Sequence, residues 1–401
     1  MQLAYIYLCR FVLSSLPVMK VDIKIGILGG GQLGRMFIQN AINYGIEVNI
    51  LDEDFSCPCA SISTEYIQGS LYDEPSIRNL ASCSDILTYE IEHVNTEVLL
   101  QLEKEGMPIF PKPSVLQIIQ NKGLQKQFYT KNNIPTAPYI ITHSDEICRG
   151  RGISHLLLQQ EKVVVKALTG GYDGKGVSII NTAELKAGNI PFGGEWLIEQ
   201  HINCKKELSV IVSVFHDDTI VHYPPVEMFF CPDANLVTYL FSPAQVSDEL
   251  STTVTTIACS AVAALNSPGL YAVELFLDED DNVFVNEIAP RPHNSGHHTI
   301  EGFYSSQYDQ LLRILLRLPP GSTDMKHPCA MINLVGEHEG AYTLAHEEEI
   351  LSIEGVFLHL YGKKMSKKGR KLGHITIVKP TVDALHTTVA LLLAKAKIIP
   401  A

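Results

Sequence analysis

Two glutamates stand at matching positions on either side of a short acidic turn. The apolar segments Tyr271–Leu277 and Val283–Ile288 are typical of paired strands, and pairing them around the turn makes Glu274 and Glu287 cross-strand partners. Like charges directly opposite destabilise a sheet, whereas Mg²⁺ or Mn²⁺ binds carboxylate and phosphate oxygens together. We therefore predict that the two glutamates hold a divalent cation, with Asn286 adding an oxygen. A shifted register that separates the acids is the alternative.

A run of polar side chains follows the second of these strands at once. Residues 291–298 read Arg-Pro-His-Asn-Ser-Gly-His-His. Guanidinium, imidazole and amide groups donate hydrogen bonds that suit a small anion. We predict that this run holds a small acyl phosphate beside the cation.

A lysine and a glycine-rich loop form a second candidate site. Lys166 ends the apolar segment Val163–Lys166, where a charge is costly unless it is used or reaches water. The loop Gly170–Gly176 follows, with four glycines and Lys175 among its seven residues. Backbone N–H groups and lysines of such a loop suit a triphosphate. The alternative is an exposed hairpin whose lysine extends into solvent.

The next apolar segment, Glu195–Ile202, offers a surface for an adenine ring. It contains Glu199, and Glu207 follows eight residues later as a candidate acceptor for ribose hydroxyls. Each acid is a weak signal by itself, because acids on strands usually face solvent.

A glycine-rich turn near the start resembles a dinucleotide fingerprint. Residues 29–34 read Gly-Gly-Gly-Gln-Leu-Gly, and Asp52 follows at the distance of a ribose-binding acid. The free N–H groups at a helix N-terminus bind a single phosphate equally well. A nucleotide cofactor and a phosphorylated substrate are therefore equally consistent with the turn, and we interpret Asp52 as a strand-end residue.

The elements around the turn alternate between strand and helix. Strands are expected at Ile23–Leu28, Ile46–Leu51, Asp85–Tyr89 and Met107–Phe110, and a helix at Gln32–Tyr44. This order predicts a parallel α/β sheet, which Pro111-Lys112-Pro113 brings to an end.

The pattern changes after residue 113. The sequence predicts one helix at Ser114–Lys131, strands Val163–Lys166 and Val177–Ile180, successive antiparallel strands at Glu195–Ile202, Glu207–Phe215 and Thr219–Glu227, and a helix at Thr252–Leu265. After about Asp324 comes a small, mostly β tail with a basic stretch, Lys363–Lys371, whose default interpretation is a solvated loop.

Composition narrows the class of protein. The 401 residues are 46% apolar and 19% charged, which indicates a well-packed globular chain of two or three domains. A net charge of −13 argues against nucleic-acid binding. Nine cysteines without zinc-site spacing fit a reducing cytoplasm.

The apolar segment before Met19 contains Arg10 and is shorter than the ~20 residues that span a bilayer. We therefore expect no membrane role and treat residues 1–18 as an extension.

Several motifs together resemble one enzyme family. They are GGGQLGRM, VVVK, GGYDGKG, Glu274 with NEIAPRPHNSGHHT, and GRKLGHI. From about Met19 to Pro380 the chain is similar to the ATP-dependent 5-(carboxyamino)imidazole ribonucleotide synthases of purine biosynthesis, which are ATP-grasp ligases.

The resemblance implies a mixed α/β and α+β architecture with three domains. They are a Rossmann-like pre-ATP-grasp domain at 19–113, an ATP-grasp domain at 114–324 with its lid at about 133–195, and a small β-rich C-terminal domain at 325–401. It also implies a cytoplasmic enzyme, and we expect a homodimer.

The implied reaction uses ATP to convert bicarbonate to carboxyphosphate. The amine of 5-aminoimidazole ribonucleotide then attacks carboxyphosphate, or the carbon dioxide it releases, and the products are the N-carboxylated ribonucleotide, ADP and phosphate. The resemblance assigns ATP contacts to Lys122, Lys166, Gly171, Gly174, Lys175, Gly176, Glu199, Ile202 and Glu207, and Mg²⁺ contacts to Glu274 and Glu287. It assigns bicarbonate chemistry to Arg291, His293 and Asn294, with His293 as candidate proton acceptor. Ribonucleotide contacts fall on Gly31, Gln32, Leu33, Glu90, Tyr172, Asp173, Asn294, Ser295, Lys363 and Arg370.

Two departures from the family pattern stand out. Residues 226–230, Val-Glu-Met-Phe-Phe, replace a segment that usually contains asparagine and histidine, and Lys122 replaces a common arginine. The alternatives are another ATP-grasp ligase, such as the formate-dependent glycinamide ribonucleotide enzyme or a biotin carboxylase-like protein; an NAD(P)-dependent oxidoreductase; and an inactive nucleotide-binding regulator.

Overall fold

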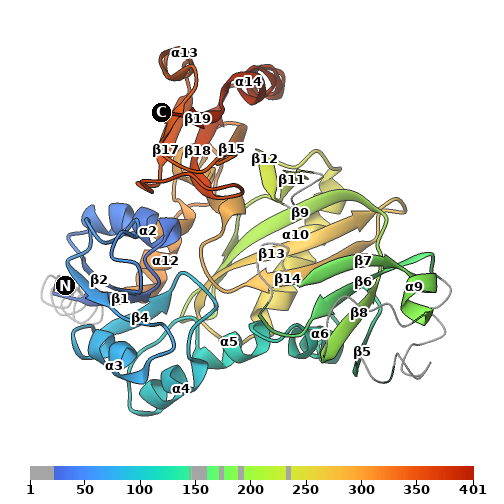
Figure 1. Ribbon diagram of the computed structural model, residues 1–401, viewed down its shortest axis with the longest axis horizontal. Coiled ribbons are helices and arrows are strands. Elements are labelled where there is room, and N and C mark those ends of the chain that lie inside the picture. The colour runs from blue at the N-terminus through green and yellow to red at the C-terminus, as the bar shows by residue number, and fades with distance from the viewer. Residues whose placement is uncertain (1–21, 144–145, 147–159, 171–175, 188–193, 232–235) are drawn as a thin grey trace, which may run out of the picture.

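The computed structural model describes residues 22–143, 146, 160–170, 176–187, 194–231 and 236–401. Residues 1–18, predicted to be an extension, and five predicted site residues lie outside that part: Gly171, Tyr172, Asp173, Gly174 and Lys175. In Figure 1 a large sheet lies at the centre, with the N-terminal domain on one side and a small sheet on the other. No helix in the described residues is both long and apolar enough to cross a membrane.

The N-terminal domain is a parallel four-stranded sheet in the order β3-β2-β1-β4. Its strands are β1 (Lys24–Leu28), β2 (Glu47–Asp52), β3 (Glu65–Gln68) and β4 (Ile86–Tyr89), and its helices are α2 (Gln32–Ile42), α3 (Glu74–Ser82) and α4 (Thr96–Lys104). The predicted strand at Met107–Phe110 is wrong, because only Ile109 forms an isolated bridge, to Leu87. Strand β3 and helices α3 and α4 were not predicted, although Asp73 caps α3 in the way that a helix start requires.

The predicted helix at Ser114–Lys131 is two helices, α5 (Pro113–Ile119) and α6 (Lys122–Lys131). Asn121 is extended at the break, and its side chain accepts the N–H groups of Gly123 and Leu124 at 2.9 and 3.1 Å. This cap starts a new helix and turns Lys122 toward the large sheet.

A small antiparallel sheet has the order β5-β8-β6-β7. It contains β5 (Tyr139–His143), β6 (Lys162–Ala167), β7 (Val177–Asn181) and β8 (Glu195–Gln200), with helix α9 (Thr182–Lys186) after β7. The prediction that β8 is the first of several successive antiparallel strands is therefore wrong, because β8 pairs with β5 and β6 and not with the strand that follows it. Trp196 and Ile198 pack on Val163 and Val165 in a separate core, which explains the pairing.

The large sheet runs β14-β13-β9-β11-β12-β15-β18-β17, with β10 paired to β9. Its strands are β9 (Cys204–Val214), β10 (Ile220–His222), β11 (Val226–Phe230), β12 (Val237–Ser242), β13 (Gly269–Asp278), β14 (Val283–Ala289), β15 (Cys329–Val335), β17 (Val356–Leu360) and β18 (Lys371–Val378). The predicted strand Thr219–Glu227 is two strands, because Pro224 and Pro225 cannot donate to a ladder.

Several helices and short turns follow or separate the strands of the large sheet. They are α10 (Asp248–Ala263), the short turns η1 (Asn294–Gly296) and α11 (Thr299–Gly302), α12 (Gln307–Leu315), α13 (Glu347–Leu351) and α14 (Val382–Lys395), and a two-stranded sheet joins β16 (Tyr342–Leu344) to β19 (Ile398–Pro400). The sequence analysis missed α13 and α14 in the tail. The tail continues the large sheet, because β15 pairs with β12.

One core joins the N-terminal domain to the large sheet. Helix α2 buries Met36 and Phe37 against Leu311 and Leu312 of α12. The Tyr44 hydroxyl donates to Asp309 Oδ1 at 2.6 Å at the same junction. This packing fixes the glycine turn that precedes α2 relative to the loop that follows β14.

Candidate functional site

The hairpin of β13 and β14 places Glu274 opposite Glu287, so the predicted pairing is confirmed. The turn alone would not produce it. Below the turn Leu277 pairs with Val283 and Leu275 with Val285, and an unbroken ladder would place Asn286 opposite Glu274. A β-bulge next to Glu274 adds one residue to β14 and shifts Glu287 into that position. Bulges at functional sites commonly redirect side chains in this way.

The charges around the two carboxylates differ. Glu287 is 41% exposed and its Oε2 lies 3.0 Å from Lys122 Nζ; this lysine lowers the pKa of Glu287. Burial, and then the charge of Glu287, raise the pKa of Glu274 to about 8. In the described part of the chain no three His, Cys, Asp or Glu side chains converge as a complete metal site. Two facing carboxylates suit a hard cation that takes its remaining oxygens from phosphate and water.

Lys166 is the penultimate residue of strand β6 and lies beside this hairpin. Its Nζ lies 2.5 Å from Glu199 Oε2 and donates to Asn286 Oδ1 at 3.1 Å. Lys126 Nζ contacts the other oxygen of Glu199. Burial alone would raise the pKa of Glu199, but the two lysines hold it at about 2. Glu199 is thus an ionised carboxylate that is already paired on both oxygens.

Lys126 did not emerge from the sequence, although a signal existed. It lies four residues after Lys122 in a helix, and positions four apart share a face. A lysine on the face that also carries the buried Tyr129 needs a buried acid as partner.

Three further described residues are predicted to contact ATP: Gly176, Ile202 and Glu207. Gly176 has φ +76° and its carbonyl accepts the Ala167 N–H at 2.8 Å, which closes the base of the glycine loop. Ile202 lies two residues after the end of β8 and is half-buried. Glu207 lies on β9 opposite Phe276, and burial raises its pKa to about 7.

Arg291 is fixed by two contacts. Its Nε lies 2.8 Å from Glu92 Oε1, and its Nη1 donates to the Pro292 carbonyl at 3.0 Å. Burial opposes the positive charge, but Glu92 keeps the pKa of Arg291 above its ordinary value. Glu92 was not predicted from the sequence; it lies two residues after Glu90 in the loop that follows β4.

His293 is held by its backbone and its ring. The fully buried Gln307 accepts the His293 N–H and donates to the His293 carbonyl, both at 2.9 Å. Nδ1 lies 2.9 Å from Ser295 Oγ, which contacts Ser209 Oγ at 2.8 Å, and Nε2 lies 3.4 Å from Glu274 Oε1. Burial, and then the charge of Arg291, lower the pKa of His293 to about 3, so the ring is neutral.

Asn294 lies one residue further on, but deeper. It exchanges two hydrogen bonds of 2.8 Å with Asn333 of β15, and Asn333 also donates to the Val237 carbonyl at 2.7 Å. The side chain keeps one N–H and one lone pair for another partner. This amide pair ties the polar loop to the large sheet.

Backbone N–H groups of the glycine turn already donate to carboxylates of the protein itself. Glu90 accepts the N–H groups of Gly31 and Gly34, the latter at 2.5 Å. Asp52 accepts the N–H of Gly30 at 2.7 Å, which confirms Asp52 as a strand-end residue that supports the turn. Burial raises the pKa of Glu90, and the two N–H groups oppose that rise.

The basic tail reaches the same turn. Lys363 Nζ donates to Gln32 Oε1 and to the Lys371 carbonyl, both at 2.9 Å. Arg370 Nη1 donates to the Met365 carbonyl at 3.1 Å. Residues separated by more than three hundred positions therefore meet at one place.

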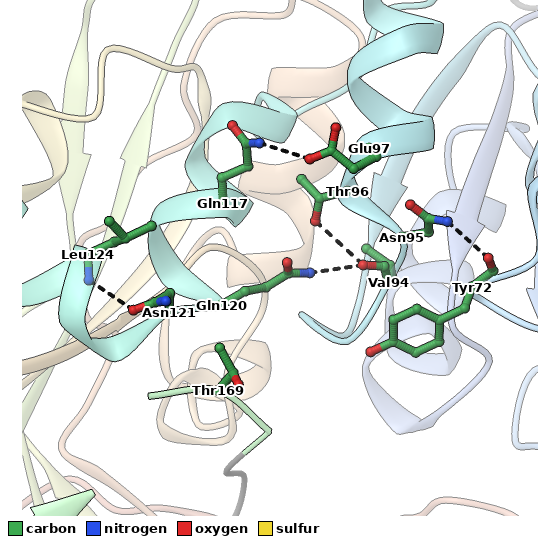
Figure 2. Close-up of a pocket in the computed structure, with 10 residues that line it drawn as sticks. All are labelled: Tyr72, Val94, Asn95, Thr96, Glu97, Gln117, Gln120, Asn121, Leu124 and Thr169. Atoms are coloured by element: carbon green, nitrogen blue, oxygen red, sulfur yellow. Dashed lines mark hydrogen bonds between the residues drawn. The ribbon is translucent and has the colours of Figure 1, made fainter. Parts of the chain in front are cut away.

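An open cavity of about 480 Å³ lies behind the loop that carries Glu92. None of the predicted site residues lines it. Figure 2 shows Gln120 reaching from the end of α5 to the carbonyl of Val94, at 2.9 Å, and the same amide donates to the Glu92 carbonyl at 2.7 Å. The wall of this cavity thus supports the loop that holds Arg291.

Comparison with known proteins agrees with this arrangement. Family models match the ribonucleotide synthetase pre-ATP-grasp domain at residues 22–120, the ATP-grasp domain at 127–308 and the phosphoribosylaminoimidazole carboxylase C-terminal domain at 329–388. The predicted ATP-grasp fold is confirmed; the exact domain boundaries stay predictions.

Individual relatives cover most of the chain. N5-carboxyaminoimidazole ribonucleotide synthase of Bacillus subtilis is 36% identical, over 90% of this chain and 92% of its own length. Chloroplastic phosphoribosylaminoimidazole carboxylase of Vigna aconitifolia is 35% identical over 93% of this chain, which spans 67% of that protein. The N5-carboxyaminoimidazole synthase of Aspergillus clavatus, solved with ADP and 5-aminoimidazole ribonucleotide, has a TM-score of 0.84 at 34% identity and covers 93% of this chain and 98% of its own. The chain therefore belongs to the N5-carboxyaminoimidazole ribonucleotide synthase family.

Proposed function

We propose that this chain carboxylates 5-aminoimidazole ribonucleotide in an ATP- and bicarbonate-dependent step of purine biosynthesis. The observation that carries the proposal is one constellation: the facing carboxylates Glu274 and Glu287 lie beside Lys122 and the polar loop that begins at Arg291. Such a site can bring the terminal phosphate of ATP and a small oxyanion together. Membership of the family supports the same reaction.

The nucleotide would lie between the small sheet and the hairpin. Lys166 and Lys122 supply positive charge for the phosphates, and the Gly170–Gly176 loop would cover them. Glu274 and Glu287 would hold Mg²⁺, which offsets charge on transferring phosphoryl groups when it is bound. Because Lys166 and Lys126 already pair with Glu199, we assign ribose contacts to Glu207.

The first chemical step transfers the γ-phosphoryl group of ATP to a bicarbonate oxygen, giving ADP and carboxyphosphate. The fixed guanidinium of Arg291 offsets the negative charge of this anion. The amine nitrogen of the ribonucleotide then bonds to the carboxyl carbon, either of carboxyphosphate itself, with phosphate leaving, or of the carbon dioxide that carboxyphosphate releases together with phosphate. In both cases the nitrogen loses a proton.

His293 is our candidate acceptor for that proton. Its imidazole is neutral, as an acceptor must be. The Ser295 N–H donates to Nδ1 at 3.3 Å, and Ser295 Oγ lies 2.9 Å from the same atom, which favours the tautomer with its proton on Nε2. A bound anion would raise the low pKa of His293 and so strengthen it as a base.

We place the ribonucleotide between the Gly31–Leu33 turn and the basic tail. Glu90 already occupies the N–H groups of Gly31 and Gly34, so its carboxylate rather than the turn would face the substrate. The phosphate is then left to Lys363 and Arg370, with Tyr172 and Asp173 of the lid completing the site.

Lys363→Ala is expected to raise the KM for the ribonucleotide about 10- to 100-fold, because it removes one charge-assisted hydrogen bond to the phosphate. The kcat and the KM for ATP should change little. Steady-state kinetics with each substrate varied in turn measures this, and Lys364→Ala, at an exposed neighbouring position, is the control. An unchanged ribonucleotide dependence would remove the tail from the substrate site.

Cation binding is expected to tighten as pH rises. The raised pKa of Glu274, about 8, means that a proton occupies the pair at neutral pH and must leave when the cation binds. Titrating Mn²⁺ by electron spin resonance between pH ~6.5 and pH ~8 should show affinity increasing with pH. A pH-independent affinity would place the cation away from Glu274.

A coupled ADP-release assay tests the function itself. ADP release should require both bicarbonate and 5-aminoimidazole ribonucleotide, and the N-carboxylated product should form in equal amount. If formate with glycinamide ribonucleotide supports turnover and the proposed pair does not, the specific activity is wrong. Tight, saturable NAD(P)H binding would favour an oxidoreductase instead.

We also propose that the protein is a cytoplasmic homodimer. Analytical sedimentation would measure the number of subunits in solution.

A further inference from the structure

Lys126 is a buried cation that the proposed reaction does not use. It lies on α6 with 3% of its side chain exposed, and Glu199, its partner on β8, is 4% exposed. An ammonium group in such surroundings is costly, and burial lowers the pKa of Lys126. Removing one member of a buried ion pair leaves an uncompensated charge, so such a group calls for an explanation.

The contacts of Lys126 lead toward the nucleotide. Its partner Glu199 uses its other oxygen on Lys166, 2.5 Å away, and Lys166 also donates to Asn286 of the hairpin. Lys126 Nζ further contacts the Thr136 hydroxyl, which donates to the Val285 carbonyl at 2.7 Å. Lys126 therefore joins α6, β8 and β14 immediately behind Lys166.

The charges in this cluster do not cancel. Two ammonium groups share one carboxylate, so the cluster carries a net charge of +1. Lys166 is 11% exposed and is thus the member with more access to solvent, while Lys126 is enclosed. If Lys126 were neutral, the charges of Glu199 and Lys166 would cancel.

We infer that Lys126 is a positioning residue that neutralises Glu199 and thereby leaves the charge of Lys166 available to the phosphates of ATP. Lys126 does not touch the nucleotide and acts only through Glu199. This inference rests on the proposed function, because it assumes that Lys166 contacts ATP.

Lys126→Met is expected to weaken equilibrium binding of a non-hydrolysable ATP analogue about 10-fold or more, since an attraction between full charges is lost. The KM for the ribonucleotide should stay within about 2-fold of the unmodified value, because that substrate binds elsewhere. Lys126→Gln, which keeps a hydrogen-bond donor for Glu199, should show the same loss even if the methionine variant does not fold. Lys131→Met, at the exposed end of the same helix, should bind the analogue normally.

The double variant Lys126→Met with Glu199→Gln separates charge balance from a structural role. It restores the net charge of +1 at Lys166, so it should bind the ATP analogue at least about 5-fold more tightly than Lys126→Met alone. If the double variant binds the ATP analogue as weakly as Lys126→Met does, the inference is overturned. Normal analogue binding by both single Lys126 variants would also overturn it. If the unmodified protein binds no ATP analogue, the proposed function fails instead, so the two failures are distinguishable.

Discussion

Glu287→Gln is expected to lose cation-dependent turnover by ~100-fold or more, with the fold intact. Removing even an indirect partner of a metal ligand commonly costs 10- to 100-fold, and Glu287 is assigned as a direct ligand. The carboxylate also balances Lys122, but glutamine keeps an oxygen within reach of that lysine, and the side chain is 41% exposed. Turnover should be measured against Mg²⁺ concentration, together with thermal unfolding.

Glu279→Gln, in the exposed turn of the same hairpin, is the matched control and should behave normally. The curve for Glu287→Gln should not recover at any Mg²⁺ concentration if two carboxylates are needed. Near-normal activity in this variant would show that Glu287 does not hold the cation.

Arg291→Lys is expected to lower kcat/KM for bicarbonate about 100-fold, comparable to losing a positioned donor to a developing anion. The guanidinium makes separate contacts with Glu92 and with the Pro292 carbonyl while it still presents further N–H groups. An ammonium group has one nitrogen and cannot keep both contacts and face the anion in the same geometry. Binding of an ATP analogue should be unaffected.

Arg313→Lys is a suitable control, because Arg313 also pairs through Nε with an acid, Asp309, at 2.8 Å, but on α12. A bicarbonate dependence that is the same in Arg291→Lys as in the unmodified chain would rule out a role for Arg291 in holding the acyl phosphate.

The sequence predicted those parts of the site that depend on local pattern. The hairpin, the strand that carries Lys166 and its pairing with the strand after the glycine loop are all present, because short apolar segments and nearby turns determine them. The pairing of Glu274 with Glu287 was also correct. The bulge beside Glu274 that produces it could not be predicted, because no residue type marks a single added residue in a strand.

Contacts between distant segments were beyond the sequence. Glu90, just after β4, accepts two N–H groups of a glycine turn that lies more than fifty residues earlier in the chain, and Lys126 of helix α6 reaches Glu199 of strand β8. Both bonds depend on tertiary packing, which local propensity does not encode. The same holds for β8, whose side chains form a core with Val163 and Val165 rather than with the next strand along the chain.

The break between α5 and α6 had a local cause that was overlooked. Asparagine favours a helix cap, and the Asn121 side chain accepts the N–H groups of Gly123 and Leu124. The consequence reaches the site, since the new helix begins at Lys122 and presents both Lys122 and Lys126 to the acids opposite.

A crystal containing Mn²⁺ and a non-hydrolysable ATP analogue tests the central claim most directly. Anomalous scattering should locate manganese between the carboxylates of Glu274 and Glu287 and against the analogue's phosphates. Manganese bound elsewhere, or phosphates bound far from this hairpin, would contradict the account.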